Sequence, residues 1–270
     1  MSVTVPQPWD RVLDELGAGE ADVALGGIWV PSMYRHRGVR YTPFAQLSAR
    51  APLAVVGRET PEAFDWSSLP GKIVATKGSN GASVGLFFKL LLREHGIDPR
   101  SVGFIQDLDG AMLLQLFAGG LGDYVVVDMA SALAFEKSGR GHVVTQLTVD
   151  GGNVPWSVYY ALGDADDVRL DKHACFVRAL RRAMLWIRER DASSFRDLLA
   201  DLFPRIDTNL LVRLTEIYRA RGMWTTPRID TAAFDRWQTG IALGHLIERP
   251  LRYEELVDVR PTAGFSDEAS

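Results

Sequence analysis

The segment Leu69-Pro-Gly-Lys-Ile-Val-Ala-Thr-Lys-Gly-Ser-Asn-Gly-Ala-Ser83 combines a turn, a short apolar strand and a loop of small residues that leads into an amphipathic helix. A loop between a strand and a helix leaves the first backbone N–H groups of the helix without intrahelical partners, so anionic or strongly polar groups can bind there. Small side chains permit close approach, and this loop holds Gly78, Ser79, Gly81 and Ala82. We therefore predict that the loop binds a ligand.

The same alternation of apolar strands and helical periodicity continues on both sides of this segment. Helical periodicity is clearest at 83–95 and 111–118. The segments predicted as strands are 22–25, 52–56, 72–75, 102–105, 124–127, 142–144 and 157–161. This alternation predicts an α/β fold with a largely parallel sheet.

From about residue 172 the pattern changes to consecutive helices. These are predicted at 172–190, 192–202, 207–221 and 231–246, and the polar tail 261–270 is predicted to be frayed. The C-terminal third of the chain is therefore expected to form a helical layer.

Composition excludes several classes of partner. The 270 residues carry a net charge of -4 without a broad basic field, which argues against nucleic acid and favours a small-molecule ligand. No apolar run approaches the roughly 20 residues that a membrane-spanning helix requires. The five histidines lack metal-ligand spacing, so we predict no metal and no cofactor.

No catalytic motif is visible, and we predict that the protein is not an enzyme. The sequence contains neither a P-loop nor a Gly-x-Ser-x-Gly elbow. The single cysteine, Cys175, lies in a predicted helix beside His173, which points to a different face of that helix. We expect Cys175 to be a buried structural thiol and not a nucleophile.

Several segments, taken in order, resemble the type II periplasmic solute-binding proteins of the nitrate, sulfonate, taurine and thiamine-precursor group of ABC transporters. The segments are Leu16-Gly-Ala-Gly-Glu-Ala-Asp-Val-Ala24, Leu69-Pro-Gly-Lys-Ile-Val74, His95-Gly-Ile-Asp-Pro99, Leu116-Phe-Ala-Gly-Gly-Leu-Gly-Asp123 and Arg249-Pro-Leu-Arg-Tyr-Glu-Glu-Leu-Val-Asp258. The resemblance covers residues 10 to 260 and leaves the ligand open. It implies two α/β lobes joined by two crossover segments, here near 56–66 and 154–161.

The resemblance also implies a division of the chain into lobes. Residues 1–66 would form the first part of lobe 1, residues 67–153 lobe 2, residues 154–260 the mostly helical second part of lobe 1, and residues 261–270 a tail. Members of the group usually begin with a strand and a helix that this chain lacks. We therefore expect a periplasmic or cell-surface protein if the N-terminus is incomplete, and a cytoplasmic one if the chain is as written.

Ligands of open α/β sheets bind beyond the carboxyl ends of strands, which selects the loops 26–31, 77–83 and 128–131. Trp29, beside Gly27, could stack on a ligand or pack in the core. Lys77 could face an anion or solvent. Ser79, Asn80 and Ser83 could bind an oxyanion or a polar ring, or cap the following helix.

Three further residues are candidates for the ligand site. Asp128 could accept a hydrogen bond from a ligand, although capping of the next helix is favoured. Asn153 and Trp156 lie beside the second crossover, where they could line the cleft, and Trp156 could equally pack at the hinge.

The resemblance implies a solute-binding component that delivers a small polar or anionic organic molecule to the permease and ATPase subunits of an ABC importer. The ligand would be of sulfonate, nitrate-like or pyrimidine type. Two alternatives stay open: an enzyme on the same scaffold, similar to pyrimidine synthases or desulfinases, and a cytoplasmic sensor.

Overall fold

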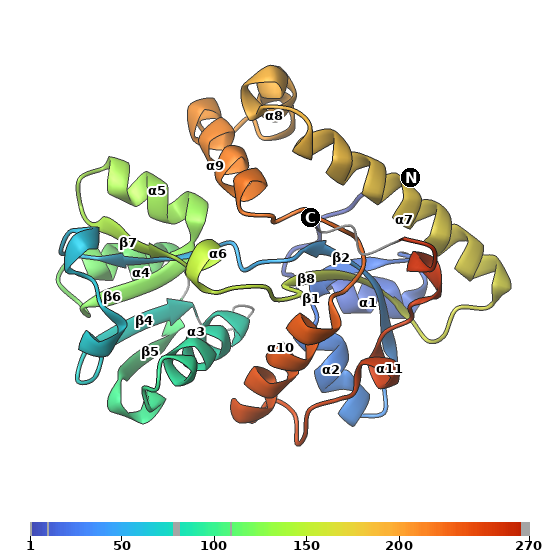
Figure 1. Ribbon diagram of the computed structural model, residues 1–270, viewed down its shortest axis with the longest axis horizontal. Coiled ribbons are helices and arrows are strands. Elements are labelled where there is room, and N and C mark those ends of the chain that lie inside the picture. The colour runs from blue at the N-terminus through green and yellow to red at the C-terminus, as the bar shows by residue number, and fades with distance from the viewer. Residues whose placement is uncertain (1, 10, 78–81, 109, 266–270) are drawn as a thin grey trace. The chain divides into compact units, whose positions relative to one another are not determined.

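The computed structural model describes residues 2–9, 11–77, 82–108 and 110–265 (Figure 1). The chain divides into two compact units, each built from separate stretches of sequence. The first unit consists of Met1–Ala49, Val154–Trp186 and Trp224–Ser270. The second unit consists of Arg50–Asn153 and Ile187–Met223.

The first unit contains an antiparallel sheet of three strands in the order β1-β8-β2. The strands are β1 (Ala24–Gly27), β8 (Ser157–Leu162) and β2 (Tyr41–Ser48). Sequence reasoning missed β2, which carries Pro43 in its interior. Proline is tolerated there because β2 is an edge strand, with a register shift between Pro43 and Ala45.

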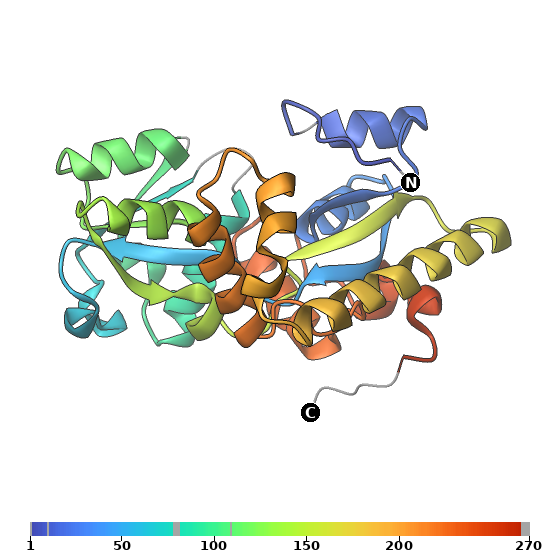
Figure 2. The same cartoon turned by 90° about the horizontal axis from the view of Figure 1, so that it is seen from above.

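Helices α1 (Arg11–Ala18) and α7 (Asp167–Arg188) lie on opposite faces of this sheet (Figure 2). Neighbouring side chains of β8 point to opposite faces because a strand has a two-residue period. Tyr159 accordingly contacts Phe176 of α7, with ring centroids 4.7 Å apart. Tyr160 is therefore on the other face, with α1.

Further helices complete the first unit: α2 (Trp29–His36), α10 (Thr231–Leu243), α11 (Tyr253–Leu256) and the 3-10 helix η6 (Arg260–Thr262). A buried polar contact joins α10 to α2. Gln238 Nε2 donates to Ser32 Oγ at 2.7 Å, and Gln238 Oε1 accepts from the Leu251 N–H at 3.3 Å. Because both side chains are fully buried and paired, this contact holds α10 in one register against α2.

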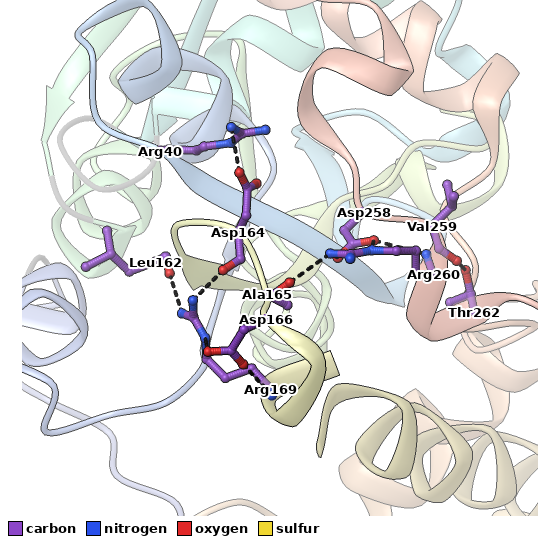
Figure 3. Close-up of polar contacts among 10 residues, drawn as sticks. All are labelled: Arg40, Leu162, Asp164, Ala165, Asp166, Arg169, Asp258, Val259, Arg260 and Thr262. Carbon is purple, nitrogen blue, oxygen red and sulfur yellow. Dashed lines mark hydrogen bonds and ion pairs between the residues drawn. The ribbon is translucent and has the colours of Figure 1, made fainter. Parts of the chain in front are cut away.

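Arginine side chains hold the turn between β8 and α7 (Figure 3). Arg40 pairs with Asp164 at 2.7 Å, and Arg169 donates to the Leu162 carbonyl at 3.0 Å. From the C-terminal segment, Arg260 donates to the Ala165 carbonyl at 3.1 Å. Arg169 and Arg260 thus bind backbone carbonyls of the turn that would otherwise require water, and the Arg40–Asp164 ion pair adds a side-chain contact to the same turn.

The second unit contains a mixed sheet of five strands in the order β5-β4-β6-β3-β7. Its strands are β3 (Leu53–Gly57), β4 (Ile73–Lys77), β5 (Gly103–Leu108), β6 (Tyr124–Asp128) and β7 (His142–Gln146). Only β4 pairs in parallel, with β5 and β6, whereas β3 is antiparallel to both of its neighbours. The prediction of a largely parallel sheet is therefore wrong, because strand direction depends on the path of the chain and not on local periodicity.

The helices that cover this sheet are α3 (Ala82–Glu94), α4 (Gly110–Ala118), α5 (Met129–Lys137) and α6 (Leu147–Asp150). Short 3-10 helices connect other elements: η1 (Pro61–Ala63), η2 (Trp66–Ser68) and η4 (Pro99–Ser101). Strands and helices share a buried apolar cluster that includes Val125, Phe117 and Leu133. Burial of this cluster is the main stabilising contribution to the second unit.

The helical stretch after α7 also lies in the second unit, which differs from the predicted lobes. It contains η5 (Ala192–Phe195), α8 (Arg196–Leu202) and α9 (Thr208–Ala220). Leu210, Leu214 and Ile217 of α9 pack against the apolar cluster of the second unit. Helical periodicity reveals an apolar face but not which core that face joins, so it could not assign this stretch.

One change of unit differs from the predicted crossovers, and another agrees with them. The first change of unit falls between residues 49 and 50, before the predicted segment 56–66. The next falls between residues 153 and 154, where the predicted segment 154–161 begins. Within the described ranges, no helix has both the length and the apolarity that are needed to cross a bilayer.

Candidate functional site

The carboxyl end of β1 lies in the first unit, where the chain turns directly into α2. Gly27 ends the strand and Trp29 begins the helix. A Cβ atom at Gly27 would collide with the indole ring of Trp29, so only glycine fits beneath that ring. The two predicted residues are thus in contact, and Trp29 is half-buried.

Two aromatic residues that sequence reasoning missed complete this end of β1. The ring of Trp9 stacks on Trp29, with centroids 6.4 Å apart and an interplanar angle of 27°. Tyr160 of β8 reaches over Gly26, where a Cβ atom would lie 2.9 Å from Tyr160 Oη and 3.1 Å from Trp9 Cζ2. No local pattern could have paired Trp9 with Tyr160, because they are far apart in the sequence.

The hydroxyl of Tyr160 is fully buried and has no hydrogen-bond partner within the described part of the chain. Burial raises the pKa of Tyr160, and the neighbouring Tyr41 and Tyr34 raise it further. The phenol therefore keeps its proton at neutral pH and can donate or accept a hydrogen bond. Leaving such a group unpaired costs roughly 1–3 kcal/mol.

Trp156 and Asn153 lie at the second change of unit. The ring of Trp156 stacks near that of the buried Trp237, with centroids 6.2 Å apart, and the Trp156 N–H donates to the Ser48 carbonyl at 3.0 Å. These contacts are those expected of a packing residue. Asn153 is exposed.

In the second unit, Lys77 and Ser83 flank the predicted ligand loop. Lys77 is the exposed last residue of β4, and Ser83 is half-buried in the first turn of α3. Ser79 and Asn80 lie outside the described residues. The positive end of the α3 macrodipole and the Lys77 ammonium both favour an anion at this position.

A polar cluster beneath α3 was not predicted from the sequence. A Cβ atom at Gly85 would lie 3.2 Å from Thr76 Oγ1 and 3.4 Å from Gln106 Nε2, so the helix approaches the strands closely here. Thr76 Oγ1 is buried and has no partner among the described residues. Lys89 Nζ donates to Gln106 Oε1 at 3.0 Å, and burial, followed by repulsion from Arg93, lowers the pKa of Lys89.

Asp128 is the N-cap of α5, the role that the sequence favoured. Its carboxylate accepts from the Ser131 N–H at 2.8 Å and from Ser131 Oγ at 2.7 Å. Each carboxylate oxygen therefore already accepts one hydrogen bond within the helix cap. The Asp128 side chain is exposed.

Cys175 is exposed on α7, and the expectation of a buried thiol is wrong. Arg178 Nη2 lies one helical turn away and donates to Cys175 Sγ at 2.8 Å. The apolar neighbours that suggested burial, Ala174 and Phe176, lie on other faces of the helix. Among the described residues, no group of three or more His, Cys, Asp or Glu side chains could hold a metal ion.

Comparison with known proteins defines the class of this fold. No family model matches the chain. The Bacillus subtilis (strain 168) protein named "Putative binding protein YtlA" is 27% identical over 266 residues, which cover 96% of this chain and 79% of that protein.

Solved structures of solute-binding proteins share the fold. The ligand-binding component of an ABC-type import system from Staphylococcus aureus, with zinc bound, has a TM-score of 0.71 at 16% identity over 96% of this chain and 85% of its own. The periplasmic aliphatic sulphonate-binding protein SsuA from Escherichia coli has a TM-score of 0.69 at 17% identity, over 92% and 79%. The chain therefore has the α/β fold of the type II periplasmic solute-binding proteins.

One enzyme also shares this fold. The desulfurization enzyme DSZB has a TM-score of 0.57 at 12% identity, covering 88% of this chain and 83% of its own. Fold similarity alone does not separate binding from catalysis, so that question depends on the residues of the site.

Proposed function

We propose that this protein is the solute-binding component of an ABC importer and captures a small polar or anionic organic molecule without converting it. The observation that carries the proposal is the fold, which it shares over most of its length with ligand-binding components of importers. The permease and ATPase of such an importer would be its partners. It would act on the side of the membrane from which the solute is taken.

Each unit contains residues proposed to bind a solute. Gly27, Trp29 and Trp156 belong to the first unit, and Lys77, Ser79, Asn80, Ser83, Asp128 and Asn153 to the second. Lys77 and the N-terminus of α3 suit an anionic group such as a sulfonate, a nitrate-like ion or a polar pyrimidine substituent. The ring of Trp29 suits an apolar or planar group of a solute.

Binding without turnover is the second part of the proposal. An exposed cysteine on a helix, paired with an arginine, is not at the end of a strand where the predicted ligand loops lie. We therefore assign Cys175 no catalytic role.

The experiment is a ligand screen by thermal shift, followed by calorimetry and by mass analysis of the recovered ligand. The panel contains alkanesulfonates, arylsulfonates, nitrate and aminopyrimidines. We expect at least one compound to bind and to be recovered unchanged, and Lys77→Ala to weaken an anionic compound, with exposed Lys172→Ala as the matched control. Recovery of a changed mass would establish an enzyme, and failure of the whole panel to bind would refute the proposed function.

A further inference from the structure

Helix α8 and the turn after it present an exposed apolar surface. Leu198 and Leu202 are 47% and 62% exposed, and Phe203 and Ile206 of the following turn are 47% and 40% exposed. Leu198 and Leu202 lie one helical turn apart, so they share a side of the helix. The Ile206 N–H donates to the Phe203 carbonyl at 3.0 Å, which closes a tight turn directly after the helix. These four side chains are called the α8 patch below.

A different side of α8 supplies the contacts that hold the helix in place. Leu199 of α8 is buried, as are Ala192 and Phe195 of η5. Figure 1 shows α8 beside α9, whose apolar side chains reach the core of the second unit. The second unit therefore packs without the α8 patch. Single exposed apolar side chains are normal on a protein surface, whereas several neighbouring ones mark an interaction site.

The α8 patch also carries one charge of each sign. Asp201 and Arg205 are both exposed, and neither has an ion-pair partner in the described part of the chain. Asp201 lies between Leu198 and Leu202 in the sequence, and Arg205 lies between Phe203 and Ile206. A surface that docks here must therefore be apolar and must offer both a cation and an anion.

A second copy of the α8 patch meets these requirements. A two-fold interface joins the same surface of both copies, so an axis at Leu202 sets the two α8 helices antiparallel. Leu198 then faces Ile206 of the second copy, and Asp201 comes near Arg205 of the second copy. A parallel arrangement would instead bring like charges together, which costs binding energy.

We propose that a second copy of this chain docks on the α8 patch in the antiparallel arrangement, so that the protein forms a two-fold dimer. A standard interface buries about 800 Å² on each partner, which is more than four partly exposed side chains supply. The dimer should therefore be weak, with a dissociation constant of about 10–100 µM. This inference does not depend on the proposed function, because the oligomeric state is measured without a solute.

The test is analytical ultracentrifugation of the full chain over about 2–500 µM, a range that brackets the expected constant. We expect the average mass to rise with concentration from that of a monomer toward that of a dimer. A monomer at every concentration would overturn the inference. If that monomer bound to phosphatidylglycerol vesicles through Leu202, the α8 patch would instead be a lipid-binding surface.

A charge placed in the α8 patch tests whether this surface forms the dimer. Leu202→Glu is expected to weaken dimerisation at least about tenfold, because each copy would bury a carboxylate against apolar side chains. Since Leu202 is exposed, the melting temperature should change little. Val168→Glu, at a position of α7 that is 66% exposed, is the matched control and should dimerise as the parent does. A dimer that Leu202→Glu leaves intact uses another surface, which would overturn the inference.

A charge swap tests the antiparallel arrangement. Asp201→Arg and Arg205→Asp should each weaken the dimer by about threefold to tenfold, because each brings like charges together. The double variant Asp201→Arg/Arg205→Asp exchanges the two signs and should restore the parent affinity. Failure of the double variant to restore it, or indifference of the dimer to all three variants, would contradict the proposed pairing.

Discussion

The ends of β1 and β4 present opposite chemistry. At the end of β1, the aromatic rings of Trp9 and Tyr160 pack against Gly26, and the Tyr160 hydroxyl is buried. At the end of β4, Lys77 is exposed and the polar side chains of Thr76 and Gln106 lie under α3. The first arrangement is apolar apart from that hydroxyl, and the second is polar and carries a positive charge. The comparison teaches that strand ends of one chain can differ in chemistry because each is covered by side chains from different elements.

The largest expected loss of stability comes from truncating Phe88, a core residue of α3. Phe88 of α3 is fully buried and contacts Trp66 and Phe104, with centroids 5.6 and 6.3 Å apart. Phe88→Ala should destabilise the protein by about 3–5 kcal/mol, since it leaves a cavity between α3 and the sheet. Chemical denaturation measures this change.

The matched control for that variant is Phe203→Ala. Phe203 is 47% exposed, so its loss should cost far less. Equal effects of the two variants would show that α3 does not depend on Phe88 for its position.

A pair of glycine substitutions tests the contrast directly. Gly26→Ala should cost about 1–3 kcal/mol, because the new methyl group would lie 2.9 Å from Tyr160 Oη and 3.1 Å from Trp9. Gly85→Ala meets Thr76 Oγ1 at 3.2 Å, but alanine gains about 1 kcal/mol of helix propensity, so the net change should stay within about 1 kcal/mol. Thermal denaturation of both variants provides the comparison.

If Gly85→Ala destabilises the protein more than Gly26→Ala, the backbone of α3 is packed more tightly against Thr76 than Gly26 is against Tyr160 and Trp9. Gly17→Ala, in α1, has open space around its Cβ position, so it measures the gain in helix propensity without a steric cost.

The smallest expected effect is a change in the pH dependence of stability, which arises from His173 in the first unit. His173 of α7 is buried and stacks on Phe44 with centroids 4.2 Å apart. Burial lowers the pKa of His173, so the unfolded chain binds a proton that the folded chain does not. The stability that this group contributes is therefore fully present above about pH 6.5 and declines as pH falls from 6.5 toward the lowered pKa.

Charged groups around His173 modify this effect without reversing it. Asp258 and Asp22 favour the protonated ring, whereas Arg169 and Arg260 oppose it, and burial is the largest contribution. We expect His173→Phe to flatten the loss of stability between pH 7 and pH 5, measured by urea denaturation, with exposed His142→Phe as the control. An unchanged slope in His173→Phe would contradict the assignment.

Local patterns located most strands and helices, and the exceptions have identifiable causes. The predicted strands and the helices at 83–95 and 207–221 correspond to observed elements within a few residues. β2 was missed because Pro43 is unfavourable in an interior strand, and only the position of β2 at the sheet edge makes it acceptable. Helices α1 and α2 were also missed, since each is short.

Only some residues of the candidate site could be predicted from the sequence. Gly27, Trp29 and Lys77 follow from the rule that ligands bind beyond the ends of strands, and the structure places them at such ends. Trp9 and Tyr160 could not be found in this way, because they meet across a distance of about 150 residues.

The sequence by itself determined the α/β class, the position of the loop after β4 and the resemblance to solute-binding proteins, because these depend on local periodicity and short motifs. Only the tertiary structure decided that β3 runs antiparallel to its neighbours, that α9 joins the core of the second unit and that Tyr160 Oη faces Gly26. The physical reason is that a period fixes which residues share a face, whereas long-range packing selects what that face contacts.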